Sequence, residues 1–343
     1  SLKTNISHHF RLFYVSRASC TFLFCRLKIF KLAVTSDLAL LMLESAIVTV
    51  KTRFSATDLM LITMSTIWGL NFTVVKASLT DFSPLTFNAI RFGTSSLFLL
   101  SMLWVREHRV GIRRKDVSRF VMLALIGNTA YQLFFINGIA LTTATNSALI
   151  LATTPIFIVI LSAVLDIEKL TSPIIQGVVL SFLGVAMIVL GSREALAFTD
   201  QSLIGDLLIV ANPISWSIYT VLSKPMLKEY SPLKLTTVTM AIGTIPLVLV
   251  AIPSLNAQNW SSIPFAAWAG LAFSAVFAIG IGYVLWYTGV SRIGSARTAI
   301  YDNLVTVFAV ASAWILLSET MTAIQIAGAI LVFVSLYLVR RKP

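Results

Sequence analysis

Cysteine and histidine are scarce in this sequence of 343 residues. The two cysteines, Cys20 and Cys25, lie close together near the N-terminus and suggest neither a disulfide framework nor a thiol site. The three histidines, His8, His9 and His108, fall outside the long apolar runs, which argues against an intramembrane metal site or a histidine proton relay. We therefore expect neither a metal nor a cofactor.

Charged residues are also few: 12% of the residues are charged and 57% are hydrophobic. This composition excludes a soluble protein. The apolar residues come in blocks of about 20 rather than in alternating stripes, which predicts membrane-spanning helices and excludes an outer-membrane barrel. The predicted fold class is all-α, a polytopic membrane protein with ten transmembrane helices. Their expected ranges are 58–77, 83–104, 118–139, 144–165, 172–191, 206–224, 232–253, 265–288, 295–317 and 322–339.

The net charge of +12 reflects where the basic residues lie. If the N-terminus is cytoplasmic, 23 lysines and arginines fall in inner loops and tails, and two, Lys76 and Arg193, fall in outer loops. The excess of basic residues on inner loops predicts that both termini are cytoplasmic in a multi-pass protein of the cell membrane. It also explains the basic composition without a nucleic-acid partner.

Residues 1–57 form a basic N-terminal extension before the first span. Residues 1–41 have apolar patches that basic residues interrupt too often for a membrane span. One interpretation is an interfacial basic helix or a targeting segment. The other is that residues 1–41 are not native, with the protein starting at Met42.

An internal repeat is the most informative pattern in the chain. Residues 58–85 align without a gap with residues 206–233, an offset of 148, and eight of the 28 positions are identical, including Trp68 with Trp216 and Lys76 with Lys224. Later positions align at an offset of 151. Two five-helix repeats, 58–191 and 206–339, must enter the membrane from opposite sides because five is odd. Such inverted repeats are typical of secondary transporters, with duplication for packing alone as the alternative.

The motifs of both repeats resemble those of the EamA-type transporters of the drug/metabolite transporter superfamily. Each repeat opens with "W…K…SPL", the first continues through "IRF" and "LTTATNSALILATTPIFIVILSAVLDIEKLT", and the second through "GSARTAIYDNLVTVFAVASAWILLSETMT". The resemblance covers residues 58–339. It implies export of amino acids, other metabolites or drugs, and in some branches sugar-linked or nucleobase substrates.

One position departs from the family pattern. The fourth predicted helix contains Pro155, whereas the aligned position in the ninth is Thr306, where many relatives would also have proline. Because proline removes a backbone hydrogen bond and favours a bend, we expect the two halves to be asymmetric here.

Two charged residues are expected at membrane depth. Asp302 lies about 10 Å from the inner face and Arg91 about 12 Å from the outer face, at 1.5 Å per helical residue. We predict that they pair or share a cavity, with Asp302 as the proton-coupling group. The alternative is a buried ion pair that fixes the packing of the second and ninth helices.

Further polar and aromatic side chains could line a substrate pathway. Trp68 and Asn71 of the first helix match Trp216 and Tyr219 of the sixth by position or spacing, with interfacial anchoring or core packing as the alternative. Helical spacing groups several others, for which interhelical hydrogen bonding is the alternative. The complete set of pathway candidates is Trp68, Asn71, Arg91, Asn128, Tyr131, Trp216, Tyr219, Tyr283, Tyr287, Tyr301 and Asn303.

Residues near the helix ends have a different expected role. Lys76 and Lys224 are expected to extend their charged ends towards the membrane surface. Glu168 and Glu319 occupy matching loop positions and are expected to cap helices or contact a gate.

These patterns together predict a secondary active transporter of a small metabolite that works by alternating access. A membrane channel or lipid-handling protein is the alternative, and an intramembrane enzyme is disfavoured because H-E-x-x-H and paired intramembrane carboxylates are absent. The expected partners are a small-molecule substrate and the lipid bilayer, and a homodimer remains open. Export is implied by the family resemblance.

Overall fold

The computed structural model describes residues 55–108, 111–139, 141, 144–191, 200–317 and 322–340. Within these ranges the chain is helical and contains no strand. The predictions for residues 1–41 and for Glu319 lie outside the described residues. Everything below concerns the compact unit that follows residue 53.

Helices occupy all ten predicted ranges. The helices are α2 (Ala56–Ser78), α3 (Pro84–Glu107), α4 (Val117–Ala124), α5 (Tyr131–Ile139), α6 (Ala144–Leu151), α7 (Thr154–Val164), α8 (Ser172–Leu190), α9 (Asp200–Met226), α10 (Pro232–Ala257), α11 (Phe265–Phe273), α12 (Gly282–Ile293), α13 (Ser295–Leu317) and α14 (Ala323–Arg340). Two π-helical segments, η2 (Leu125–Ala130) and η4 (Ser274–Ile281), join α4 to α5 and α11 to α12. Two short 3₁₀ turns, η1 (Arg114–Asp116) and η3 (Trp260–Ser262), precede α4 and α11.

Seven helical stretches of the described residues are long and apolar enough to cross a membrane, and α14 is a shorter apolar helix. This confirms a helical protein with several membrane spans. The number of ten crossings stays a prediction.

Local sequence sets where the helices begin. Ser55 caps α2 through a capping box, in which its hydroxyl accepts from the Asp58 backbone and the Asp58 carboxylate accepts from the Ser55 backbone. Proline stands in the first turn of α3 at Pro84 and of α10 at Pro232. Proline fits there because the first N–H groups of a helix have no partner within the helix.

The two repeats differ at the position of Pro155, as the sequence predicted. The chain turns at Ala152 and Thr153, so that α6 ends at Leu151 and α7 begins at Thr154. The equivalent α13 runs unbroken through Thr306. The predicted asymmetry is therefore confirmed, and its cause is the N–H that proline lacks.

The two π-helical segments lie at equivalent positions of the two repeats. Residues 125–130 of η2 correspond, at the offset of 151, to residues 276–281, which lie within η4. A π-helical segment inserts an extra residue into a helical turn and shifts its hydrogen bonds, and such segments are frequent at functional sites. Both repeats therefore have the same irregularity at the same place.

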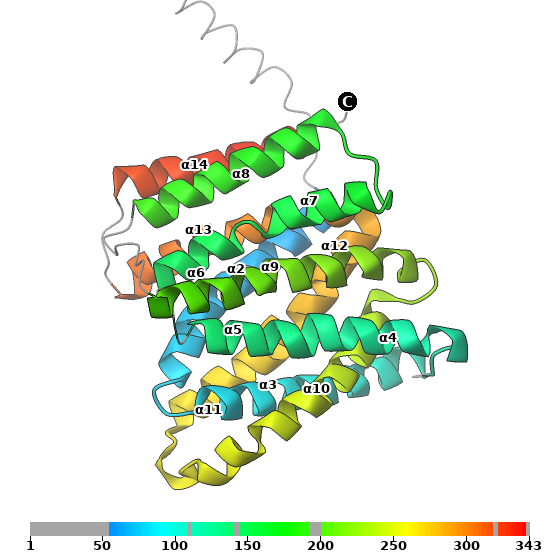
Figure 1. Cartoon of the computed structure of the whole chain (residues 1–343), viewed down its shortest axis with the longest axis vertical. Coiled ribbons are helices and arrows are strands. Elements are labelled where there is room, and N and C mark those ends of the chain that lie inside the picture. The colour runs from blue at the N-terminus through cyan, green and yellow to red at the C-terminus, as the bar shows by residue number, and fades with distance from the viewer. Residues whose placement is uncertain are drawn as a thin grey trace, which may run out of the picture. The chain divides into compact units, whose positions relative to one another are not determined.

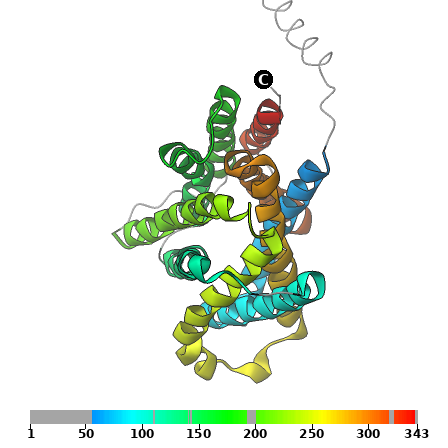
Figure 2. The same ribbon diagram turned by 90° about the vertical axis from the view of Figure 1, so that its right-hand side faces the viewer.

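The helices pack against one another in closely contacting pairs. Figure 1 shows α8 and α14 side by side, and the view turned by 90° in Figure 2 agrees. Their backbones approach so closely that a Cβ added at Gly184 would lie 2.7 Å from the Gly328 carbonyl oxygen. Small residues permit this approach in membrane helix pairs. Elsewhere α2 packs on α13, α3 on α10, and α5 and α7 on α9.

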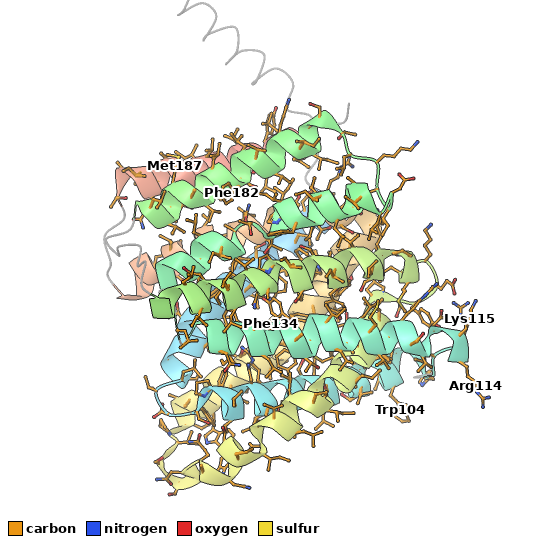
Figure 3. The ribbon with its side chains drawn as sticks, viewed as in Figure 1. Trp104, Arg114, Lys115, Phe134, Phe182 and Met187 are labelled. Carbon is orange, nitrogen blue, oxygen red and sulfur yellow. The ribbon has the colours of Figure 1, made fainter. Side chains whose placement is uncertain are left out.

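The bundle has two chemically different ends. We call the end with the α3–α4, α7–α8, α9–α10 and α12–α13 connections the basic end, since it contains most of the lysines and arginines between helices. Arg114 and Lys115 project from it in Figure 3. The opposite end contains the α2–α3 and α10–α11 connections, where the Gln258 amide bonds to Ser83 and Asp81.

Candidate functional site

An aromatic cluster lies where the two repeats meet. Trp216 of α9 is at its centre, with ring centroids 5.0 Å from Tyr283, 5.4 Å from Tyr131, 5.6 Å from Trp286 and 6.0 Å from Trp68. The rings meet edge to face or tilted, which are favourable arrangements for aromatic pairs. The complete aromatic cluster consists of Trp68, Tyr131, Trp216, Tyr219, Tyr283, Trp286 and Tyr287.

Trp68 and Trp216 occupy equivalent positions of the two repeats, and the structure brings them together. The Trp68 indole N–H donates to the Ala278 carbonyl in η4 at 2.7 Å. A side chain at Gly282 would collide with the Trp68 ring. A backbone acceptor in η4 and the glycine that begins α12 therefore hold Trp68 in place.

A buried polar layer continues from the aromatic cluster across α9, α10 and α12. The Tyr219 hydroxyl bonds with the Thr239 hydroxyl at 2.6 Å, and the Trp286 indole donates to Thr220 at 3.2 Å. The amide of Asn128 in η2 is fully buried beside Tyr219, but none of its atoms meets the geometry of a hydrogen bond. A buried amide in this state could bond to a solute or to water.

Arg91 of α3 is buried next to the aromatic cluster, with 7% of its surface exposed. Its guanidinium donates to Asn88 at 2.5 Å, to Gln132 at 3.3 Å and to Ser274 at 3.3 Å. It also interacts electrostatically with Tyr131 and Tyr283. Every acceptor is a neutral oxygen.

The direct ion pair between Arg91 and Asp302 that the sequence allowed does not form in this structure. Neither residue has an ion-pair partner among the described residues. Asp302 is partly exposed and interacts electrostatically with Tyr131, as Arg91 does. The other predicted arrangement, in which the two residues share a cavity, stays a prediction.

Two sequence candidates, Tyr301 and Asn303, bond to residues outside the aromatic cluster. The Tyr301 hydroxyl donates to Asp58, and the Asn303 amide donates to Ser181 at 2.8 Å, which ties α13 to α2 and α8. Asn71 has a buried amide oxygen without a hydrogen-bond donor. Tyr301 and Asn303 therefore have contacts typical of interhelical bonding, the alternative considered above.

Glu168 of the first repeat bonds to residues of the second repeat at the basic end. Its carboxylate pairs with Lys224 at 2.5 Å and accepts the backbone N–H groups of Ser295 at 2.5 Å and Ala296 at 3.3 Å, where α13 begins. Burial alone would raise the pKa of Glu168, but Lys224 and the two amides outweigh it and hold the pKa below its usual range. Gly294, with φ of 93°, turns the chain into α13 beside this carboxylate. Lys224 is therefore an ion-pair partner, not an extended surface lysine.

Two further groups join the repeats at the basic end. Glu107 bonds to Ser231 and pairs with Lys234 at 3.7 Å. Arg113 pairs with Asp116 at 2.8 Å and with Glu229.

Tyr230 completes the second group. The Tyr230 hydroxyl donates to the Asp116 carboxylate at 2.8 Å. This bond, followed by the bond from Arg113, holds the pKa of Asp116 below its usual range. Ion pairs and charge-assisted bonds thus join the two repeats at this end of the bundle.

The described residues contain no cluster of three or more metal-ligating side chains. At the opposite end, a surface cavity of about 460 Å³ is lined by the α2–α3 connection and the end of α10. Its lining includes no residue of the aromatic cluster.

Sequence reasoning missed several residues of this region. Trp286, fully buried in the aromatic cluster, follows Tyr283 by three residues, so its helical spacing could have revealed it. Ser274, which bonds to Arg91, gives no comparable signal because buried polar residues are common in interhelical contacts.

Comparison with known proteins gives a consistent result. Residues 55–190 and 203–341 each match the EamA-like transporter family. The chain is 30% identical over 279 residues to a protein named "Uncharacterized transporter YyaM" of Bacillus subtilis (strain 168), covering 80% of this chain and 90% of that one. It is 25% identical over 278 residues to a "Probable terminal-alkyne amino-acid exporter" of Streptantibioticus cattleyicolor, covering 80% and 90%.

The fold also has a counterpart among solved structures. A protein crystal structure matches with a TM-score of 0.72 at 16% identity, over 83% of this chain and 96% of the other. At this identity the similarity concerns the fold alone.

Proposed function

Because this chain belongs to the EamA-like transporter family, we propose that it is a secondary transporter that moves a small metabolite across the membrane by alternating access. The chain is an integral membrane protein with several helical spans. We further propose that the chain crosses the membrane ten times, as two inverted five-helix repeats arranged around the aromatic cluster.

The contact between Trp68 and Trp216 carries this proposal. Equivalent residues of two inverted repeats meet where the repeats' pseudo-symmetry axis passes, and that axis is where inverted-repeat transporters bind their substrates. The equivalent π-helical segments η2 and η4 lie beside this contact. Their irregular backbone supports a binding region at mid-membrane.

The orientation follows from charge. We place the basic end, and with it both termini, in the cytoplasm, and the protein in the cell membrane. The groups around Glu168 and Asp116 would then form the closed cytoplasmic gate of an outward-directed state. Alternating access requires these contacts to break when the basic end opens.

Asp302 is proposed as the proton-coupling group. It is a carboxylate without an ion-pair partner among the described residues, next to Tyr131 at the aromatic cluster. Carboxylates in such positions act as proton carriers in transporters. A relative named as an amino-acid exporter supports export of an amino acid or a related solute.

The test is untargeted mass spectrometry of the medium from cells that produce the chain, its Asp302→Asn variant or neither. We expect a small solute to accumulate outside with the parent chain, and at least tenfold less of it with Asp302→Asn. Asp166→Asn is the matched control, because Asp166 is an exposed carboxylate with φ of 49°, a conformation that asparagine also adopts.

The outcomes separate the parts of the proposal. Equal accumulation with Asp302→Asn would refute proton coupling through this residue and keep export. No solute in any culture would refute export. Flux that neither saturates nor builds up against a gradient in proteoliposomes would favour a channel or a lipid-handling protein.

A further inference from the structure

We propose that Arg91 binds an anionic group of the transported solute, so that the solute is a small organic anion, or a zwitterion, with an apolar or aromatic body. This inference rests on the proposed function, which it narrows by chemical class. Its basis is the contrast between Arg91 and the paired carboxylates Glu168 and Asp116.

The guanidinium of Arg91 lacks a counter-charge. No carboxylate of the described residues lies within ion-pair distance of it, although only 7% of the residue is exposed. A charge at this depth is costly unless an opposite charge compensates it. By contrast, Glu168 and Asp116, which join helices at the basic end, each have a basic partner. These two carboxylates, which have a structural role, are thus paired with a base, whereas Arg91 is not paired with an acid.

The guanidinium also has N–H donors that make no hydrogen bond. Arginine has five N–H bonds, and three hydrogen bonds use them here, to Asn88, Gln132 and Ser274. The Nε–H has no acceptor, and the bonds to Gln132 and Ser274 are long at 3.3 Å. A carboxylate could take the unused donors and replace these two weak bonds with charge-assisted ones.

The surroundings define the rest of the solute. The guanidinium carbon lies 5.3 Å from the Phe87 ring centroid and 5.6 Å from that of Phe92, which holds it by cation–π contact. Its electrostatic partners Tyr131 and Tyr283 both contact Trp216. An anion at Arg91 would therefore have its remaining atoms beside the aromatic cluster, which favours an apolar or aromatic body.

A structural role for Arg91 predicts a different behaviour. If Asn88, Gln132 and Ser274 fully satisfied the guanidinium, it would fix α3 against α5 and η4 and would not discriminate between solutes of different charge. Selection by charge is therefore the property to measure.

The experiment uses the purified full chain in detergent and three probes with the same phenylpropyl body. Hydrocinnamate is an anion, hydrocinnamamide is neutral and phenylpropylamine is a cation. The shift of the thermal-unfolding midpoint with probe concentration gives an apparent Kd for each. We expect hydrocinnamate to bind about tenfold to a hundredfold more tightly than the amide, since bonds to a charged group are stronger, and the amine to give no shift.

Variants test whether Arg91 causes the preference for the anion. Arg91→Gln should lose the preference for hydrocinnamate. Arg91→Lys keeps the positive charge but lacks the planar, two-pronged guanidinium, and it should retain part of the preference. Arg292→Gln is the matched control, because Arg292 is an exposed arginine at the basic end whose removal changes the net charge equally. It should bind all three probes as the parent does.

Each outcome decides the inference. Equal shifts with the amide and the anion, or no shift with any probe, would overturn it, and so would an unchanged preference in Arg91→Gln. If Arg91→Gln fails to fold, the three probes on the parent chain still decide. Binding of hydrocinnamate through Arg91 without solute in the mass-spectrometry experiment would refute the proposed transport and leave the anion site standing.

Discussion

Glu168 provides the sharpest test of the closed basic end. Its carboxylate accepts three bonds, from Lys224, Ser295 and Ala296, and its side chain is 9% exposed. Glu168→Gln keeps the shape and one acceptor oxygen, but removes the negative charge that attracts Lys224 and the positive N-terminus of α13. We therefore expect the closed arrangement to lose stability relative to an open one.

The expected loss is about 2 kcal/mol. A hydrogen bond to a charged group contributes about 1.5–3 kcal/mol, and a charge at a helix terminus about 0.3–1 kcal/mol. Glutamine retains part of the bonding to the backbone, and Lys224, 27% exposed, can turn towards water. Since about 1.4 kcal/mol is a factor of ten, the population open at the basic end should rise about 30-fold.

Access of a thiol reagent to a buried cysteine measures this population. Ser223 is fully buried next to Lys224 in α9, so Ser223→Cys in a background with Cys20 and Cys25 replaced by serine reports opening of the basic end. We expect a maleimide to label it about 30-fold faster with Glu168→Gln. The matched control is Asp166→Asn, two residues away in the same connection and exposed.

Two results would refute this reasoning. A labelling rate within twofold of the parent would mean that Glu168 does not hold the basic end closed. An equal increase with Asp166→Asn would mean that any lost charge in this connection has the same effect.

The pH dependence of the same assay follows from the lowered pKa of Glu168. A carboxyl group with a lowered pKa in the folded state stabilises above its unfolded value, which is 4.5, and loses this effect as the pH falls through the folded value. We therefore expect the ratio of labelling rates between Glu168→Gln and the parent to stay constant between about pH 6 and about pH 8. A ratio that collapses within this range would contradict the ion pair with Lys224.

Two further predictions concern stability and are measured by unfolding of the purified protein in detergent. Trp68→Phe should cost about 2 kcal/mol, because it removes the donor to the Ala278 carbonyl in η4 and leaves that buried oxygen without its partner; unchanged stability would contradict the bond. Gly184→Ala should cost about 1–3 kcal/mol, since its Cβ meets the Gly328 carbonyl, whereas Gly93→Ala, with no atom within 4 Å, should stabilise by about 0.5–1 kcal/mol. Similar effects of the two alanine variants would contradict the close packing of α8 on α14.

Much of the fold could be predicted from the sequence because helix formation is local. Each of the ten predicted ranges contains helix, and α13 begins at Ser295 as expected. The largest difference is α9, which begins at Asp200 instead of 206. The break before Pro155 was predictable because proline acts within one helical turn.

The candidate site was predictable where the repeat itself gave the signal. The alignment pairs Trp68 with Trp216, and their contact follows from the symmetry. The alignment could not assign a partner to Arg91 or to Lys224. Depth along a helix placed Arg91 near Asp302, but depth does not determine which way a helix is rotated.

The sequence by itself determined where the helices lie and that the chain is a repeat, since the first depends on neighbouring residues and the second on comparison of the chain with itself. Only the tertiary structure decided that Arg91 bonds to neutral oxygens and that Glu168 pairs with Lys224 of the other repeat. The tertiary structure also decided that η2 and η4 are π-helical. The physical reason is that these contacts depend on helix rotation and register, which the packing of all helices sets together.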